Sequence, residues 1–556
     1  MTPARAPLVS TPALAALVVL GTLALPLLQL VSIDFERTAA AVAFAPALIF
    51  GWRVWSAEAG LWLVRPRGRA AVILGTALVL FSVLFAAQPA PALVQAANGT
   101  VLLCLALLAS GLVRTEPRTA RWLLLGIVGG GLLGALTLAW PWLVHPDPRN
   151  APAATFHWLY PHIRHIGLHL LPAAALAPVL LTGAATPRAR IALWLAAALL
   201  ATALVWSGGR TPLLGIAVAA VFALWHLHAS QRRSLALAYA LIFAAGLLAC
   251  TLLWTTTGSF GWWRAVQTTV DAGSVNELSS RRLDIWKACV PFITDSPWLG
   301  YGPDGYRFLT PKMDAQQPHN VLVQWALACG IPGLLLGLAA LARLLWRPLR
   351  RASEIRPPVE TVAAVAVIAA IVAAGLTDGS LYHILSTHAF ALAAGLVIGR
   401  TRLDPAATPP VPATVAATAR TVGSRGSVAL ALAAALVLCV HGWLFNQLIA
   451  PDAPAPTSTA ARVLRAFPST TFGFDRWLDA WEPQDPKNAL EWTQWAQRHS
   501  AYAWLYHLRA SRLLARHGFQ DAARIEFHLY ETTQPKAFRK KAASSSSPPA
   551  PTPTNR

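Results

Sequence analysis

The feature that most constrains this chain is a series of long uncharged stretches that recurs from Leu8 to Phe445. Many of them approach or exceed the ~18–20 residues that an α-helix needs to cross a bilayer. Of 556 residues, 55% are hydrophobic and 12% are charged, whereas about 25% of the residues of a soluble domain are charged. We therefore expect an all-α polytopic membrane protein with about 12–13 transmembrane helices, and we exclude a soluble domain on a single anchor.

Basic residues lie between the apolar stretches and predict the orientation of the chain. Lys and Arg number 45 against 24 Asp and Glu, a net charge of +21. Because clusters such as Arg65–Arg69 and Arg114–Arg121 separate spans, we read them by the positive-inside rule as cytoplasmic loops and do not infer nucleic-acid binding. This reading predicts thirteen spans, with the N-terminus inside and the C-terminus outside: 10–33, 38–60, 70–87, 93–113, 122–144, 168–185, 191–206, 212–229, 235–257, 320–342, 359–377, 384–399 and 427–448.

Several common chemistries lack their motifs in this sequence. The chain has no Walker GxxxxGK[ST], no HExxH, no GxSxG, no DxD and no Rossmann glycine fingerprint. Its five cysteines form no CxxC pair, so no thiol metal site is indicated. The remaining candidates are basic, His and hydroxyl residues in three groups on the predicted outer face.

The first group surrounds Arg164, in the segment Phe156–His169. His165 and His169 are four residues apart and would share a helix face, so a metal site is conceivable. The alternative is that these side chains snorkel at the membrane interface beside an aromatic belt.

The second group is Trp206–Pro212, a break between two apolar stretches with Arg210 at its tip. Ser207 and two glycines leave backbone N–H groups free there, and an arginine offers a bidentate fork for phosphate. The alternative is a simple Gly-Gly reversal between two helices.

The third group lies in and after a long outer loop. It includes Arg281 and Arg282 in Ser279–Trp286, then Pro297–Gly302, and then His319 and Asn320 before a span that carries Gly330–Gly333. An imidazole at the membrane surface can take a proton from a hydroxyl near neutral pH, since its ordinary pKa is about 6.5.

Taken in order, these motifs resemble the O-antigen ligase superfamily, which includes lipopolysaccharide O-antigen ligases, O-antigen polymerases and pilin-type protein O-oligosaccharyltransferases. The resemblance extends roughly from Phe156 to Gly399, and Asp378–His383 looks like the short outer turn of the family. It implies about twelve membrane helices, a long periplasmic loop and glycan transfer from undecaprenyl diphosphate to an acceptor hydroxyl without a metal, nucleotide or other cofactor. The site would face the periplasm from the bacterial inner membrane.

The resemblance also implies roles for individual residues. Arg164 and Arg210 would bind the diphosphate, and His319 would be the general base. The other candidates would contact substrate: Arg281, Arg282, Asn320, Ser207, Asp378 and His383. The acceptor stays open between lipid A–core, a growing glycan and a protein. A lipid-linked glycan transporter is the alternative that is not an enzyme.

The sequence also predicts the domain organisation. Residues 1–155 should form N-terminal membrane helices, 156–400 the ligase-like catalytic region with its long loop at 258–318, and 401–450 a cytoplasmic loop and the last span. Beyond the Pro/Ala-rich linker Pro451–Pro456, residues 451–535 should form an exported helical segment with one tetratricopeptide-like hairpin, followed by a disordered tail at 536–556. The linker predicts few contacts between the exported segment and the membrane part.

Overall fold

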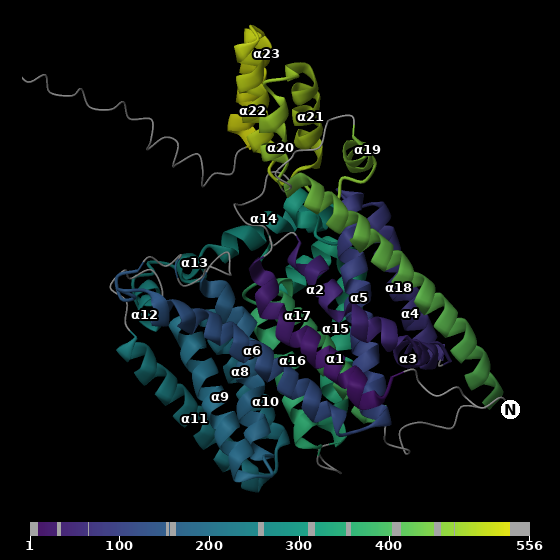
Figure 1. The fold of residues 1–556 in the computed structure, drawn as a ribbon, viewed down its shortest axis with the longest axis vertical. Coiled ribbons are helices and arrows are strands. Elements are labelled where there is room, and N and C mark those ends of the chain that lie inside the picture. The colour runs from purple at the N-terminus through teal and green to yellow at the C-terminus, as the bar shows by residue number, and fades with distance from the viewer. Residues whose placement is uncertain are drawn as a thin grey trace, which may run out of the picture.

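The computed structural model describes residues 9–30, 35–64, 66–151, 155, 163–253, 261–309, 317–351, 357–402, 413–449, 458–471 and 473–533. Helices occupy all thirteen segments that the sequence predicts to span the membrane (Figure 1). They are α1 (Thr11–Ala24) with η1 (Leu25–Leu30), α2 (Glu36–Phe50) with α3 (Trp52–Val64), α4 (Pro66–Leu84), α5 (Pro89–Thr115), α6 (Thr119–Val144), α8 (Ile163–Thr182), α9 (Pro187–Trp206), α10 (Arg210–His226), α11 (Ala229–Leu252), α15 (Val321–Arg351), α16 (Val359–Gly375), α17 (Ile384–Arg402) and α18 (Ala413–Ile449).

The lengths of these helices suit a bilayer. Within the described residues, nine helices are long and apolar enough to cross a membrane, and a tenth span is possible if the bent pair α2 and α3 is counted as one. Three shorter apolar helices, Gly68–Leu84, Arg210–His226 and Val359–Gly375, account for the other predicted segments. The described part of the chain has no strand. The predicted all-α polytopic membrane fold is confirmed.

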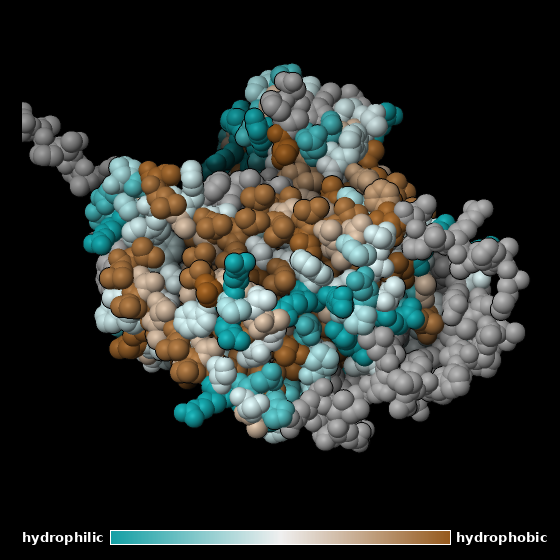
Figure 2. All heavy atoms as spheres, turned by 60° about the horizontal axis from the view of Figure 1, so that its bottom comes forward, coloured by the Kyte–Doolittle hydropathy of each residue, from teal (hydrophilic) through white to brown (hydrophobic). Residues whose placement is uncertain are grey.

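Polar side chains gather at the ends of the bundle, and apolar ones cover its flank. Figure 2 shows brown side chains around the middle of the bundle and teal ones toward the end that Figure 1 places at the bottom. Loops at that end contact one another: Arg121 Nη1 donates to the Gly183 carbonyl (3.0 Å), and Arg400 Nη2 donates to the Pro117 carbonyl (2.9 Å). These contacts place three of the arginine-rich loops on one face, as the charge pattern predicts.

The second predicted span differs from expectation. In place of one continuous helix over 38–60, α2 and α3 meet at Gly51 with an 85° bend. A Cβ at Gly51 would lie 2.7 Å from a methyl carbon of Leu108, so the bend packs closely on α5. Glu58 of α3 is fully buried, forms an ion pair with Arg114 (2.5 Å) and accepts a hydrogen bond from Ser110 (3.2 Å). A buried carboxylate needs such partners, which explains its place among apolar residues.

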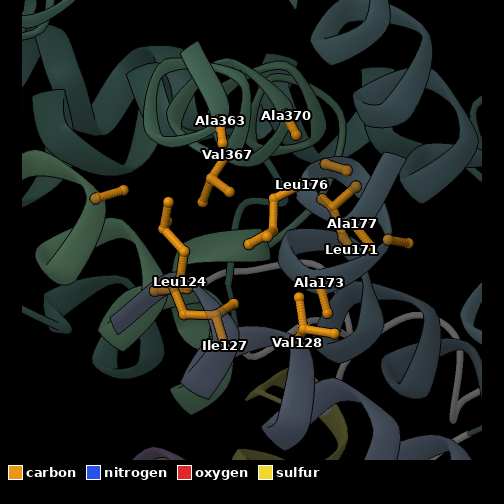
Figure 3. Close-up of a cluster of buried hydrophobic side chains, with 14 of the residues drawn as sticks. Leu124, Ile127, Val128, Leu171, Ala173, Leu176, Ala177, Ala363, Val367 and Ala370 are labelled. Atoms are coloured by element: carbon orange, nitrogen blue, oxygen red, sulfur yellow. The ribbon is translucent and has the colours of Figure 1, made fainter. Parts of the chain in front are cut away.

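The core of the bundle forms where α6, α8 and α16 meet. Figure 3 shows Leu124, Ile127 and Val128 of α6 facing Leu171–Ala177 of α8, with side chains of α16 above them. Small residues allow the close approach: a Cβ at Gly131 would lie 2.3 Å from the Cβ of Ala173. Membrane helices pack through such small residues because no hydrophobic effect drives apolar helices together in lipid.

The end of the bundle opposite the arginine-rich loops, which we call the outer face, carries the remaining helices (Figure 1). The long loop there forms α12 (Trp262–Val270), α13 (Val275–Leu278), α14 (Arg282–Asp295) and η2 (Gly305–Phe308), and η3 (Ser380–Tyr382) lies between α16 and α17. The C-terminal segment forms α19 (Thr459–Ala466), α20 (Phe474–Trp481), α21 (Pro486–His499), α22 (Ala503–Arg516) and α23 (Gln520–Thr533). Helices α22 and α23, joined at Gly518, occupy the position of the predicted hairpin.

The C-terminal segment packs on the membrane part, contrary to the expectation of few contacts. Leu444 and Leu448 of α18 share one core with residues of α19–α22. Phe467, after α19, packs among side chains of α5 and α18, and Gln88 Nε2 donates to the Arg498 carbonyl (2.6 Å). The reason is that the last turns of α18 extend an apolar surface, which the C-terminal helices cover.

Candidate functional site

The site is organised around Asp378, which begins the turn between α16 and α17. Its Oδ1 accepts hydrogen bonds from His319 Nδ1 (2.8 Å) and from the backbone N–H of Gly379 (2.8 Å). Its Oδ2 forms an ion pair with Arg282 Nη2 (2.6 Å). One carboxylate thus joins a histidine at the start of α15 to an arginine at the start of α14.

The charge state of Asp378 follows from these partners. Burial raises the pKa of the carboxyl, but the hydrogen bond from His319 and the charge of Arg282 outweigh it and lower the pKa to about 2, against a usual value of 3.8. The carboxylate is therefore ionised near neutral pH and holds a proton on Nδ1 of His319. This tautomer, which we assign from the hydrogen bond, leaves Nε2 of the ring able to accept a proton.

The backbone around His319 is fixed in an unusual conformation. His319 has a φ of +51°, in the left-handed region that non-glycine residues seldom adopt. Before it, the Pro318 carbonyl accepts a hydrogen bond from Trp286 Nε1 (2.9 Å). After it, Asn320 Oδ1 accepts from the N–H groups of Leu322 (2.9 Å) and Val323 (3.2 Å) and caps α15. The strain at His319 is thus held by contacts on both sides.

Arg210 and Arg282 each donate hydrogen bonds to hydroxyl groups of neighbouring segments. Arg210, the first residue of α10, donates from Nη1 to Thr269 Oγ1 (3.1 Å) and from Nη2 to Ser280 Oγ (3.2 Å). Arg282 Nη1 donates to Thr211 Oγ1 (3.4 Å), the residue after Arg210. The two guanidinium groups therefore lie on adjoining segments, beside the carboxylate that holds His319.

The long outer loop is fastened to a break in α15. Cys329 and Gly330 have non-helical backbone angles, which frees carbonyls of the preceding turn. Tyr301 N donates to the Leu327 carbonyl (2.6 Å), and Ile331 N donates to the Pro297 carbonyl (2.7 Å). The two sequence motifs, Pro297–Gly302 and Gly330–Gly333, therefore lie at one interface, where the loop packs against α15.

Comparison with known proteins finds similarity over part of the chain. Residues 195–338 match the model of a family described as O-antigen ligase. The chain is also 30% identical over 190 residues to an O-antigen ligase of Pseudomonas aeruginosa, over 33% of this chain and 41% of the relative. This part of the chain is therefore similar to O-antigen ligases. The resemblance predicted from the sequence is therefore confirmed, although the match spans well under two thirds of the relative's length.

The matched family region includes only part of the site. It contains Arg210, Arg282 and His319, together with the loop that docks on α15. Asp378 lies beyond it, so the central carboxylate comes from a segment that the family match does not reach.

Other residues predicted for the site have different surroundings. Arg281 is 60% exposed and forms an ion pair with Asp284 (3.4 Å) at the edge of the site. Ser207 is buried, and its hydroxyl donates to the Leu204 carbonyl (2.6 Å) within α9. Asn320 Nδ2 donates to the Leu376 carbonyl (2.9 Å), so this side chain holds the backbone at the end of α16. Arg164 lies in the first turn of α8, and its side chain is outside the described part of the structure.

His383 lies beneath the site among other histidines. It is buried, and its ring centroid lies 4.8 Å from that of His165 and 4.9 Å from that of His169. Burial and these two neighbours lower the pKa of His383 well below its usual value, so the ring is neutral. Two further histidines of the predicted group, at 157 and 162, lie outside the described residues, and within the described ones no group of three or more metal ligands forms.

Two hydroxyl side chains that contact the predicted arginines, and one further arginine, were not identified from the sequence. Thr211 and Ser280 adjoin the predicted arginines, and that adjacency was the available signal. Arg37 stands over the ring of Tyr382, 4.7 Å from its centroid, and Tyr382 donates to Asp304 Oδ1 (3.1 Å). No local pattern connects these three residues, which come from three distant segments.

Proposed function

We propose that this protein transfers a glycan from a polyprenyl diphosphate to an acceptor hydroxyl on the outer face of the membrane. The observation that carries the proposal is the contact of His319 Nδ1 with Asp378, which leaves Nε2 as a proton acceptor while Arg282 binds the same carboxylate. The similarity of residues 195–338 to the O-antigen ligase family supports a transferase of this kind.

In the proposed step, the acceptor oxygen attacks the anomeric carbon of the glycan. The new C–O bond forms as the bond from that carbon to the diphosphate oxygen breaks, and the electron pair leaves with the diphosphate. The proton of the acceptor hydroxyl moves to Nε2 of His319, and Asp378 stabilises the imidazolium that results. A single displacement inverts the configuration at the anomeric carbon.

Arg210 and Arg282 offset the charge that grows on the leaving diphosphate. A planar guanidinium matches two phosphate oxygens at once, and fixed donors need no rearrangement as the bond breaks. Removing one such donor costs on the order of 10²–10³ in rate. Arg164 remains a proposed third contact, and Arg281 a contact of the glycan at the exposed edge.

The acceptor that we favour is lipid A–core, as for a lipopolysaccharide O-antigen ligase. A protein acceptor or a growing glycan is the alternative, and the glycoprotein profile and lipopolysaccharide banding of a deletion strain would separate them. For a transporter we would expect charged side chains along the spans. The buried carboxylate of Glu58 is neutralised by Arg114, whose side chain is 40% exposed, and this pair lies toward the opposite face from His319, which speaks against that reading.

The proposed location is the bacterial inner membrane, with the site facing the periplasm. Single cysteines introduced at Arg281 and Arg118 would test it, since these residues lie on opposite ends of the bundle. An impermeant thiol reagent applied to intact spheroplasts should label position 281 and not position 118. The reverse pattern would overturn the orientation.

Two substitutions test the chemistry. Arg210→Lys keeps the charge but loses the fork, so transfer should fall by about 10²-fold or more. His319→Ala should lower transfer by about 10²–10⁴-fold while donor binding persists, because holding the donor needs no proton acceptor. Arg524→Lys and His528→Ala, both exposed on α23, are the matched controls. Near-normal transfer by both site variants would refute the proposal.

A further inference from the structure

The turn that begins at Asp378 has a second firmly held residue, Tyr382, at the end of η3. Tyr382 is 8% exposed. Its hydroxyl donates to Asp304 Oδ1 (3.1 Å), and its backbone carbonyl accepts from Arg37 Nη2 (3.4 Å). The Arg37 guanidinium also lies over the ring, 4.7 Å from the centroid. Tyr382 is therefore held between α2 and the long outer loop.

Asp304 has a fixed position on that loop. Its backbone has a φ of +64°, in the left-handed region, and its side chain, 4% exposed, also forms an ion pair with Arg307 (3.2 Å). Two residues earlier in the chain, Gly302 N donates to the Ala328 carbonyl (3.1 Å) beside the break in α15. The docking of the loop on α15 thus sets where Asp304 meets Tyr382.

The Tyr382 hydroxyl serves as a hydrogen-bond donor inside the protein. Burial and the charge of Asp304 raise the pKa of Tyr382 above its usual value of 10, so the proton stays on the oxygen. The polar pocket beside Asp304 has a volume of about 40 Å³, room for about three water molecules and too little for a sugar ring. The bond therefore acts on the turn and not directly on a substrate.

The outer loop thus holds the turn at two points. Arg282 of α14 forms an ion pair with Asp378 (2.6 Å), and Asp304, just before η2, accepts from Tyr382 (3.1 Å). Only three residues separate Asp378 from Tyr382, and Tyr382 N donates to the Gly379 carbonyl (2.8 Å), which closes the turn on itself. A shift at one end of so short a turn therefore moves the other end.

We propose that Tyr382 is a positioning residue for the transfer step. By fixing its end of the turn, it keeps the Asp378 carboxylate at hydrogen-bonding distance from His319 Nδ1. This inference rests on the proposed transferase function and deepens it. A carboxylate displaced by about 1 Å no longer orients the imidazole, and a misplacement of that size can cost about 10²-fold in rate. Productive geometry then depends on the docked loop, which brings both of its contacts to the turn together.

Tyr382→Phe tests the role, because it removes the bond to Asp304 and keeps the ring beneath Arg37. In deletion-strain membranes supplied with donor extracted from that strain, kcat for glycan transfer should fall about tenfold, while the donor KM changes by less than about twofold. The matched control is Tyr239→Phe. Tyr239 is 7% exposed, and its hydroxyl donates to the Ala175 carbonyl (2.7 Å) between α11 and α8, so this variant should transfer at the wild-type rate.

A double-mutant cycle shows whether Tyr382 acts through Asp378. Adding Tyr382→Phe to Asp378→Asn should slow transfer no further, because the carboxylate that the hydroxyl positions is already lost. The loop side gives a second test that leaves the tyrosine in place. The amide oxygen in Asp304→Asn can still accept from the hydroxyl, so this variant should transfer faster than Asp304→Leu. The unfolding midpoint of each variant shows how much of the change comes from lost stability.

Three outcomes would overturn the positioning role. They are a wild-type kcat in Tyr382→Phe, a multiplicative loss in the double variant, and a raised donor KM with unchanged kcat, which would make the tyrosine a substrate contact. The two proposals fail separately. Near-normal transfer by both Arg210→Lys and His319→Ala refutes the proposed function, whereas wild-type kcat in Tyr382→Phe beside an inactive His319→Ala refutes only the positioning role.

Discussion

At the scale of single residues, the site depends on one carboxylate that serves two partners. Asp378 holds the imidazole of His319 through Oδ1 and the guanidinium of Arg282 through Oδ2. An imidazole oriented in this way presents a defined nitrogen, Nε2, to a bound substrate. In the proposed mechanism, Asp378 would position the ring and stabilise the charge that it gains, and would not itself transfer the proton.

Asp378→Asn should separate this role from the role of the base. The amide keeps the size of the side chain but cannot offset the imidazolium, so transfer should fall by about 10²-fold or more while donor binding changes little. The rate of glycan transfer and the dissociation constant of the donor, measured in the same membranes, test the prediction. If donor binding weakens by the same factor as the transfer rate, the substitution has disrupted the structure of the site.

The lowered pKa of Asp378 predicts how stability depends on acid. Because the folded-state pKa is about 2 and the usual value is 3.8, this carboxylate contributes stability that is present above about pH 4 and is lost as the pH falls toward 2. The difference in unfolding midpoint between the wild type and Asp378→Asn, measured in detergent, should therefore shrink as the pH is lowered from about 5 to 2.5. A difference that stays constant over this interval would contradict the assigned pKa.

At the scale of elements, the break in α15 connects the long outer loop to the membrane part. The backbone at Gly330 has a φ of +68°, and a Cβ there would lie 2.4 Å from backbone atoms of Trp298. Gly300, on the loop, also has a positive φ and would bring a Cβ to 2.4 Å from the Leu327 carbonyl. Glycine is needed at both positions because two backbones meet there at hydrogen-bonding distance. The contact sets where α14, and with it Arg282, stands relative to α15 and His319.

Gly330→Ala should loosen this contact. A non-glycine residue in the left-handed region costs about 1–2 kcal/mol, and the overlap with Trp298 adds to that cost. We expect the loop to become more sensitive to protease, and transfer to fall, while the protein still inserts in the membrane. Gly99→Ala, on α5 with open space around it, is the control and should leave both measurements unchanged. Wild-type protease resistance in Gly330→Ala would show that the docking is not needed to hold the loop.

At the scale of the whole molecule, the C-terminal helices and the membrane part form a joint core. The apolar end of α18 is covered by α19–α22, and Phe467 reaches between α5 and α18. The Pro/Ala-rich linker therefore does not separate two independent units. The C-terminal helices stand on the outer face, the same face as the candidate site (Figure 1).

Ending the chain after Ile449 should destabilise the membrane part. The truncation would expose Leu444 and Leu448 and remove Phe467, so we expect the thermal unfolding midpoint to fall by several degrees and less protein to accumulate. A chain that ends after Thr533 keeps every described helix and is the matched control. An unchanged unfolding midpoint in the shorter protein would show that the membrane part is stable without the C-terminal helices.

What the sequence determined by itself is the membrane architecture and the order of the site motifs. The bilayer demands about twenty apolar residues per crossing and places basic loops on one side, and both demands are local in sequence. For the same reason, Arg210 at a helix start and His319 before α15 could be recognised as candidates from their immediate neighbours. The resemblance to O-antigen ligases could be recognised as well, since many of the ordered motifs lie within residues 195–338, which match that family.

Only the tertiary structure decided which side chains meet. Asp378 reaches His319 across 59 positions and Arg282 across 96, Ser207 turns inward, and Arg281 turns outward. The C-terminal helices cover the end of α18 despite the linker. Such contacts depend on the way in which small and large side chains of different helices pack together. No local pattern in the sequence carries that information.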